Sequence, residues 1–386
     1  MDQLRSFELL CQYVTPVDVQ VHPPGREPLF KDHDWEAILK LADGYLVTPS
    51  LYLGLQRRGL LDYLDKDLRE HLAAIYLLNR ARNAKIKTQA LATIELLNSE
   101  AIQPVLLKGI AGLLTGLYED DGERFMGDID LMVEKSELIQ VVELLTTHDY
   151  ECDPGVRAAV LNHSFYKHEL SLLPNAGGVK IDLHVRPTGS SGYQAFVSSD
   201  GARRQASPLV VGTATALLPP PEFRLMHNFY HAQSLDRCYL TGSINLRQLI
   251  DWSKLWRMNE AKVSYTEIND ALGRHRLCYS FALYVFTAEQ LLMHPVPAGV
   301  TVGGFINGLF LRQQLCLQHI WFYKLNQVVV FLLKGGLSFT PERVRLKFGD
   351  LPTVNLVILV ARKYLDSAWY IRRFYQVKSH VICFIR

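Results

Sequence analysis

The pattern of apolar and polar positions divides this chain into a helical beginning, a mixed middle and a helical end. Between Leu68 and Asn98, apolar residues recur every three or four positions, which predicts one long amphipathic helix or a close pair. From Glu222 onward the pattern is again largely helical. We therefore expect three units: an N-terminal, mostly helical region (1–100), a core (101–217) and a helical C-terminal domain (218–386).

The middle of the chain alternates short apolar runs with helical stretches. Residues 104–107 have the pattern of a buried strand, and residues 127–133 and 179–185 alternate apolar and polar positions. The turn Pro174–Gly178 joins a further strand, over 164–173, to the last of these and predicts a hairpin. We expect an α+β fold with a mixed sheet of four or five strands and helices on one face.

Two aspartates stand one residue apart in the strand over 127–133. Because side chains alternate between the two faces of a strand, Asp128 and Asp130 leave the same face. Two neighbouring carboxylates repel each other unless cations lie between them, and Mg²⁺ usually binds one or two carboxylates together with substrate phosphates. The alternative is an exposed strand end with two solvated acids.

Two further features favour a site for phosphates and metal ions. The strand over 104–107 leads through Lys108 and Gly109 into a helix expected from Ile110 to about Tyr118, an arrangement that suits an anion. The later strand carries Asp182 as a third acid, with His184 on the same face. A phosphate-binding turn, a carboxylate pair and a third acid are the parts that a two-metal transfer site requires.

The segment from about Ile102 to Arg186 resembles the nucleotidyltransferase superfamily typified by DNA polymerase beta. More closely, it resembles the bacterial uncharacterised nucleotidyltransferase family within that superfamily. Most of the superfamily has Gly-Ser or Gly-Gly at the turn where this chain has Lys108-Gly109. The residues that carry the resemblance are Leu107-Lys108-Gly109, Arg124-Phe125-Met126-Gly127-Asp128-Ile129-Asp130-Leu131 and Ile181-Asp182-Leu183-His184, with a fourth patch at Leu246-Arg247-Gln248-Leu249-Ile250-Asp251-Trp252.

The resemblance implies an enzyme with a nucleotidyltransferase-type mixed sheet as its catalytic core. Its substrate would be an NTP such as ATP, its cofactor Mg²⁺ (or Mn²⁺), and pyrophosphate would leave as the NMP moves to an acceptor hydroxyl or phosphate. The acceptor could be a small molecule, a protein or RNA. The expected catalytic residues and metal ligands are Asp128, Asp130 and Asp182, and the expected nucleotide-binding residues are Lys108, Gly109, Arg124 and His184.

Several of these residues have a plainer interpretation. Arg124 follows an acidic run and could be a surface charge, and His184 could be a packed, hydrogen-bonded histidine. His227 and His231 share a helix face but lack the glutamate of a metalloprotease site, so they could line the nucleotide pocket instead of binding zinc. The alternative for the whole chain is a nucleotide-binding or scaffold protein on the same fold with little catalysis.

Charge is unevenly distributed along the chain. The net charge is +2, but from Thr301 to Arg386 twelve Lys and Arg residues face three Asp and Glu residues, a local excess of nine positive charges. Such a region could bind a large anionic acceptor, a nucleic acid or an acidic membrane surface, or it could be a solvated helical face. Gly- and Ser-rich residues 187–207 are expected to form a long surface loop.

Composition predicts a folded protein of the cytoplasm. Hydrophobic residues make up 48% of the chain and charged residues 21%, which excludes a disordered polymer. The six cysteines are scattered without a C-x-x-C pair, as expected for reduced thiols. We find no secretory signal and no run of 18 uncharged apolar residues, so a transmembrane segment is not expected.

Overall fold

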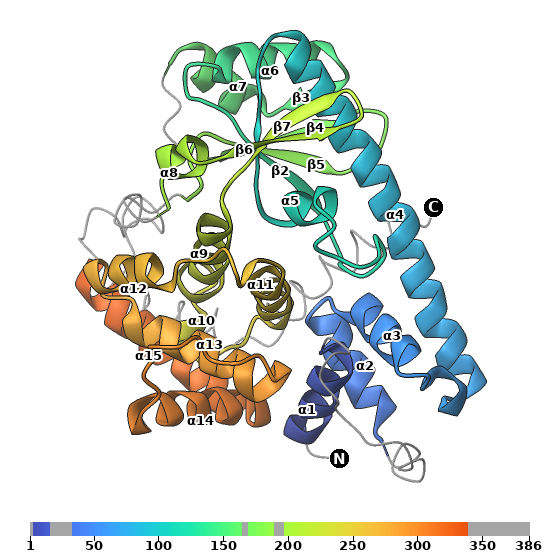
Figure 1. Ribbon diagram of the computed structural model, residues 1–386, viewed down its shortest axis with the longest axis vertical. Helices are drawn as coiled ribbons and strands as arrows, with labels where there is room; N and C mark the ends of the chain where they lie inside the picture. The colour runs from blue at the N-terminus through green and yellow to red at the C-terminus, as the bar shows by residue number, and fades with distance from the viewer. Residues whose placement is uncertain (1–2, 16–32, 164–168, 189–196, 339–386) are drawn as a thin grey trace, which may run out of the picture.

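The computed structural model describes residues 3–15, 33–163, 169–188 and 197–338 (Figure 1). The fold is α+β, as predicted, with a mixed sheet and helices at both ends of the chain. In Figure 1 the sheet lies in the upper half, the first three helices at the lower right and the C-terminal helices at the lower left, with the long helix α4 running up the right side. The division into three domains remains a prediction.

The sheet has seven strands in the order β3-β4-β5-β2-β1-β7-β6, more than the four or five expected. The central strands β2 and β5 are parallel, as are β1 and β7, and the remaining neighbours are antiparallel. The predicted hairpin is present as β4 and β5. The strands are β1 (Val105–Leu106), β2 (Asp128–Met132), β3 (Tyr150–Cys152), β4 (Glu169–Pro174), β5 (Lys180–His184), β6 (Ser207–Val211) and β7 (Ala214–Leu218).

Helices account for most of the remaining described chain. The first part contains α1 (Gln3–Val14), α2 (Trp35–Gly44), α3 (Thr48–Arg57), the 3₁₀ turn η2 (Leu61–Tyr63), α4 (Lys66–Ser99), α5 (Lys108–Leu114), α6 (Leu138–Thr147), α7 (Pro154–Leu161) and α8 (Ser199–Arg204). The last part contains α9 (Pro221–Tyr230), the π-helical turn η4 (His231–Leu235), α10 (Cys238–Thr241), α11 (Leu246–Asn259), α12 (Tyr265–Arg274), α13 (Cys278–Leu292), α14 (Gly304–Gln318) and α15 (Ile320–Ser338).

Two predictions, one of a helix end and one of a long loop, need correction. Helix α5 ends at Leu114, four residues before the expected Tyr118, because Gly116 adopts a left-handed φ of +67° that a helix cannot continue through. The stretch expected to be a long surface loop contains helix α8, which Ser198 caps by accepting a hydrogen bond from the Gly201 amide. The long amphipathic helix is confirmed as the single helix α4.

Helix α4 crosses the sheet and is fixed to two of its strands by polar side chains. The Gln89 side chain donates to the Val179 carbonyl (2.7 Å) and accepts from the Val179 amide (3.0 Å) at the start of β5. The Asn98 side chain makes the same pair of bonds with Thr215 of β7, at 2.9 and 2.8 Å. These two clamps set the position of the helix over the sheet.

The segment of residues 119–127, here called the 119–127 connection, leads directly into β2. Asn79 and Asn83 of α4 are buried and donate hydrogen bonds to its backbone carbonyls, and the Ser50 hydroxyl of α3 donates to the carbonyl of Glu123. Lys254 of α11 forms an ion pair with the Glu123 side chain (2.9 Å). Three helices from distant parts of the chain therefore hold the backbone that positions Asp128.

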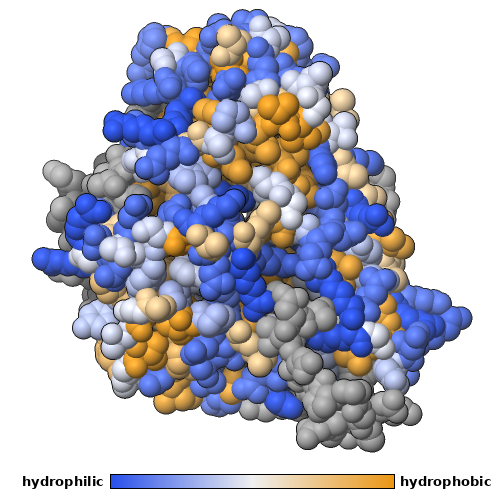
Figure 2. Space-filling view, in the orientation of Figure 1, coloured by the Kyte–Doolittle hydropathy of each residue, from blue (hydrophilic) through white to orange (hydrophobic). Residues whose placement is uncertain are grey.

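Buried apolar residues from the first helices, the sheet and helices α9, α11 and α13 form one continuous core. On the face drawn in Figure 2, hydrophilic surface predominates across the middle of the molecule, between the sheet and the helical ends. Among the described residues, no helix combines the length and apolar character that crossing a bilayer requires. Cys11, Cys152, Cys238, Cys278 and Cys316 are free thiols.

Candidate active site

The predicted carboxylates lie together on one face of the central strands β2 and β5. These parallel strands pair Asp128 with Lys180 and Asp130 with Asp182. Because paired residues share a face, Asp128, Asp130, Lys180 and Asp182 leave the same side of the sheet. The alternate residues of both strands, among them Ile129 and Ile181, are fully buried on the other side. A slip of one residue would bury the carboxylates in the apolar core, so the apolar pattern fixes the acidic face.

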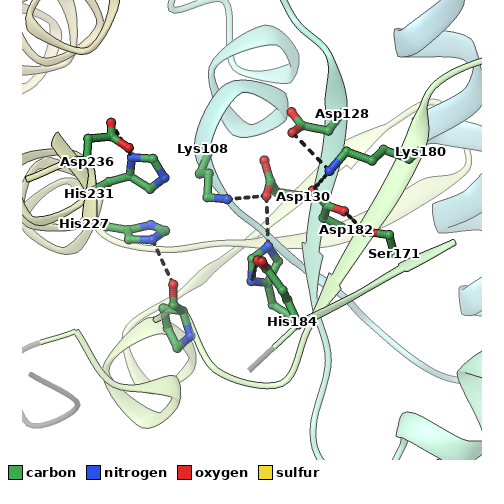
Figure 3. A network of polar contacts seen from close by, with 12 residues as sticks. Lys108, Asp128, Asp130, Ser171, Lys180, Asp182, His184, His227, His231 and Asp236 are labelled. Atoms are coloured by element: carbon green, nitrogen blue, oxygen red, sulfur yellow. Dashed lines mark hydrogen bonds and ion pairs between the residues drawn. The ribbon is translucent and has the colours of Figure 1, made fainter. Parts of the chain in front are cut away.

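Asp130 is the most deeply buried of the three acids, with 2% of its surface exposed. The Lys108 ammonium lies 2.5 Å from its Oδ1 atom, and Nε2 of His184 lies 2.9 Å from the same oxygen (Figure 3). Burial alone would raise the pKa of Asp130, but Lys108 and the hydrogen bond to His184 outweigh burial and hold it well below its usual range. Asp130 is therefore ionised, with two cationic or hydrogen-bonding partners.

His184 is buried between two acids. Its Nδ1 atom lies 3.5 Å from Oε2 of Glu169, which is the residue opposite it on the antiparallel strand β4. The structure thus shows His184 packed and hydrogen-bonded to Asp130 within the acidic cluster, and its expected role in nucleotide binding stays a prediction. Its ring orients the Asp130 carboxylate.

Asp128 and Asp182 are joined by Lys180. The Lys180 ammonium lies 2.5 Å from Oδ2 of Asp182 and 3.9 Å from Oδ2 of Asp128, and the Ser171 hydroxyl donates to the other oxygen of Asp182 (2.6 Å). Burial, together with the like charges of Asp130 and Asp182, raises the pKa of Asp128 above its ordinary value. Figure 3 shows Lys180 between Asp128 and Asp182, beside the pair formed by Lys108 and Asp130.

The donor set suits a hard divalent cation. Three carboxylates on neighbouring strands offer only oxygen ligands, which Mg²⁺ and Mn²⁺ prefer. As the described side chains stand, no three acidic, histidine or cysteine groups are arranged to hold an ion. The ammonium groups of Lys108 and Lys180 lie against these carboxylates instead. The three carboxylates therefore fit a divalent metal ion chemically, and the two lysines supply the positive charge beside them.

Lys108 has a strained backbone as well as a buried charge. Its φ of +49° lies in the left-handed region, which costs a residue other than glycine on the order of 1–2 kcal/mol. Its position at the first residue of α5 directs its ammonium to Asp130. The next position, Gly109, has no room for a side chain. The Arg124 guanidinium lies against it, and an added Cβ would be 2.5 Å from a guanidinium nitrogen.

Arg124 is buried and paired rather than exposed. Its Nε donates to Oδ2 of Asp251 on α11 at 2.7 Å, across 127 residues of sequence. Asp251 therefore pairs with Arg124, and the Arg247 guanidinium on the same helix donates to the carbonyl of Phe125 (3.3 Å). Arg124 belongs to the last part of the 119–127 connection, and Arg247 contacts that part at Phe125, shortly before Asp128.

A cationic pocket adjoins the acidic face. Lys108 and Arg124 line it from the core, Arg224, His227 and His231 line it from α9 and its continuation, and Asp251, the partner of Arg124, lines it from α11. His227 donates from Nε2 to the Pro187 carbonyl (3.1 Å), and burial beside Lys108 lowers its pKa to about 3, so it is neutral at physiological pH. The cavity is small, about 40 Å³, or roughly three water molecules, and a nucleotide needs side chains to move.

A family model described as an uncharacterised nucleotidyltransferase matches residues 31–292. The chain belongs to this family. It is accordingly an enzyme of the nucleotidyl-transfer class, and its family implies an NTP as substrate. The match covers the sheet, the acidic face, the cationic pocket and helices α2 to α13. No curated protein and no solved structure matches the chain.

Three residues of the candidate site were not anticipated as members of it. Lys180 stands two residues before Asp182 on one strand, so period-two alternation alone could have placed it on the acidic face. Arg224 stands three residues before His227 on α9, a spacing that shares a helix face. Glu169 could not have been found in this way, because its contact with His184 depends on the register between β4 and β5.

Proposed function

We propose that this nucleotidyltransferase moves an NMP from an NTP to an acceptor hydroxyl or phosphate, with Mg²⁺ or Mn²⁺, and releases pyrophosphate. The observation that carries the proposal is the contact between the acidic face and the cationic pocket. Lys108 belongs to both, because it binds Asp130 and lines the pocket with Arg124 and Arg224. Carboxylates for metal ions thus lie beside cations for phosphates, which is the division of charge that the reaction needs.

In the proposed reaction the acceptor oxygen forms a bond to the α-phosphorus, and the bond from that phosphorus to the oxygen bridging to the β-phosphate breaks. Pyrophosphate leaves with the bonding electrons, and Asp182 accepts the proton of a hydroxyl acceptor. Asp128, Asp130 and Asp182 would hold the divalent ions. When bound, these ions would offset the negative charge of the phosphates and lower the pKa of the acceptor hydroxyl. Lys108, Arg224 and the backbone near Gly109 would stabilise the charge on the leaving group.

Arg224, which lines the pocket, favours phosphate as its ligand, and Arg247 is a second desolvated guanidinium on the helix whose Gln248 and Asp251 line the same pocket. Burial is the first cause that lowers the pKa of each guanidinium, and the neighbouring Arg124 adds to it at Arg247. Among the described residues, the Arg224 side chain makes one long hydrogen bond, 3.5 Å, to the Thr115 hydroxyl. Desolvated guanidinium groups gain most from an anion with several oxygens, since arginine binds phosphate through paired hydrogen bonds.

A nucleotide-binding protein with little catalysis is the second candidate, and one observation favours it. The carboxylates that would bind metal ions are already neutralised by Lys108 and Lys180. If these ion pairs persisted in the presence of nucleotide, the chain could bind an NTP through its cationic pocket without activating it. Transfer of label, and not binding, therefore distinguishes the two candidates.

The test is incubation of the purified chain with each α-³²P-labelled NTP and Mg²⁺ or Mn²⁺, with and without a cell extract as the source of acceptor. We expect label transfer with release of pyrophosphate, and a loss of at least about 100-fold in Asp128→Asn. Asp121→Asn is the matched control, because Asp121 also pairs with a lysine, Lys87, but lies outside the acidic face. Absence of transfer with all NTPs, or equal transfer by both variants, would contradict the proposal.

A further inference from the structure

Lys180 occupies an unusual position for a surface lysine. Its ammonium lies between Asp182, at 2.5 Å, and Asp128, at 3.9 Å, while about 40% of its side chain remains exposed. Asp182 is buried and Asp128 is half-buried, with 8% and 41% of their side chains exposed. One cation from the chain itself thus joins two of the three carboxylates that a divalent ion would use.

The position of Lys180 follows from the sheet. It is opposite Asp128 in the parallel register and two residues before Asp182 on the same strand, so its side chain lies beside both acids. Three carboxylates on one face repel each other, and burial together with this repulsion raises the pKa of Asp128 even with the lysines present. A nearby ammonium is the simplest way to stabilise such a face before a metal ion arrives.

The Lys180 and Lys108 ammonium groups differ in how easily they can move away from their carboxylate partners. Lys108 is 23% exposed, begins helix α5 and holds the buried Asp130. Lys180 is the first residue of β5, directly after a turn with two glycines of positive φ, and its four-carbon stem extends to solvent. The Lys180 side chain is the more exposed of the two, at 40% against 23%, so it exchanges the acids for water more easily than Lys108 does.

We propose that Lys180 is an internal counter-ion that competes with divalent cations for Asp128 and Asp182, so that the enzyme takes up its metal together with the nucleotide. The inference rests on the proposed function and adds an order of binding to it. In the free enzyme the ammonium weakens binding of a metal ion alone. When the nucleotide is present, the released ammonium lies beside the acidic face and pairs with the polyphosphate.

The charges of the site agree with this order. Three carboxylates with the ammonium groups of Lys108 and Lys180 leave one net negative charge. Two divalent ions alone would change that to three net positive charges, whereas two ions with a triphosphate, which carries about four negative charges, restore one negative charge. The site is therefore balanced either with its own lysines alone or with metal and nucleotide together.

Mn²⁺ titration, followed by electron paramagnetic resonance of the free ion, tests the inference on the full chain. Wild type, Lys180→Met, Lys180→Arg and Lys87→Met are each titrated without nucleotide and with a non-hydrolysable α,β-methylene NTP. Lys87→Met is the matched control, because Lys87 pairs with Asp121 at 3.4 Å and is 37% exposed, close to Lys180. Thermal melting of each variant verifies that it is folded.

We expect Lys180→Met to bind Mn²⁺ without nucleotide at least about 10-fold more tightly than wild type, because a positive charge has been removed from beside two ligands. Lys180→Arg and Lys87→Met should bind like wild type. The nucleotide should tighten Mn²⁺ binding less in Lys180→Met than in wild type. A lysine with only a structural role would give weaker or unchanged metal binding in Lys180→Met.

Two results would overturn the inference, and they have different meanings. If Mn²⁺ binds to all four proteins with nucleotide, but Lys180→Met is no tighter than wild type without it, Lys180 is no counter-ion and the proposed function stands. If none of the proteins binds Mn²⁺ even with nucleotide, the metal site is absent and the proposed function fails with the inference.

Discussion

At the scale of single residues, Lys108 combines two effects that substitution can separate. Its ammonium neutralises Asp130, while its backbone adopts a left-handed φ of +49° that only glycine adopts without strain. Lys108 therefore exchanges backbone stability for a cation within 2.5 Å of the buried carboxylate.

Comparison of Lys108→Gly with Lys108→Ala isolates the backbone term, because both remove the ammonium. We expect Lys108→Gly to be the more stable variant by about 1 kcal/mol, since alanine keeps the strain and glycine relieves it. Urea unfolding at pH 7 measures the difference.

The matched control is the same pair of substitutions at Lys85, an exposed position within helix α4. There the order should reverse, with alanine more stable than glycine by about 1 kcal/mol, because glycine lowers helix propensity. Alanine being the more stable residue at both positions would show that the turn at Lys108 carries no strain.

At the scale of elements, alternation along the chain was enough to predict β2, β5 and the shared face of Asp128 and Asp130. It could not show that β2 and β5 are neighbours, because strand order depends on packing between distant segments. The hairpin of β6 and β7 was missed although Gly212-Thr213 separates two alternating runs, which is a readable turn signal. The contact of Arg124 with Asp251 depends wholly on how α11 packs.

The 119–127 connection illustrates how elements position the site. Asn83 is fully buried and its side-chain amide donates to the carbonyls of Asp121 (2.5 Å) and Arg124 (2.7 Å). Without that donor, the Asp121 carbonyl loses its hydrogen bond from α4, and the Arg124 carbonyl keeps the one from Asn79. The backbone before Asp128 would then be held less firmly.

We expect Asn83→Ala to lower the free energy of unfolding by about 2–3 kcal/mol, because the substitution leaves a carbonyl without its donor in a buried place. Hydrogen exchange within residues 119–127 should accelerate. Gln140→Ala is the control, because the Gln140 side chain bonds to Glu100 at the exposed surface, and its effect should stay within about 0.5 kcal/mol. Equal protection of residues 119–127 in both variants would show that other contacts hold the connection.

At the scale of the whole molecule, buried charged pairs join parts of the chain that are far apart in sequence. Lys254 of α11 pairs with Glu123 at 2.9 Å, and Arg57 of α3 lies 3.7 Å from the same glutamate. The excess positive charge of 301–386 lies mostly beyond the described residues, so its proposed role with an anionic acceptor remains a prediction. Within the described residues, helices α3 and α4, which precede the sheet, and α11, which follows it, all contact the 119–127 connection that leads to Asp128.

His294 makes the stability of the whole molecule depend on pH. It follows α13, has no exposed surface and presents its ring edge-on to Trp252, 5.0 Å between ring centres. Neither ring nitrogen has a hydrogen-bond partner among the described residues. Burial, with a smaller contribution from Arg257, lowers the pKa of His294 to about 4. The folded protein therefore keeps this histidine neutral at pH values where an unfolded chain would protonate it.

The sign of the effect follows from proton binding. Between the unfolded pKa of about 6.5 and the folded pKa of about 4, the unfolded chain binds a proton that the folded chain excludes, so stability falls as pH falls. From pH 7.5 to pH 5 we expect His294 to account for about 2 kcal/mol of the loss in free energy of unfolding. His227, with its pKa of about 3, acts in the same direction.

Urea unfolding at the two pH values measures the contribution of His294. The loss of stability should be smaller by about 2 kcal/mol in His294→Phe, and unchanged in His71→Phe, whose ring is exposed on α4. An equal loss in wild type and His294→Phe would mean that the buried ring gains a proton as readily as an exposed one, and that the packing around Trp252 admits water.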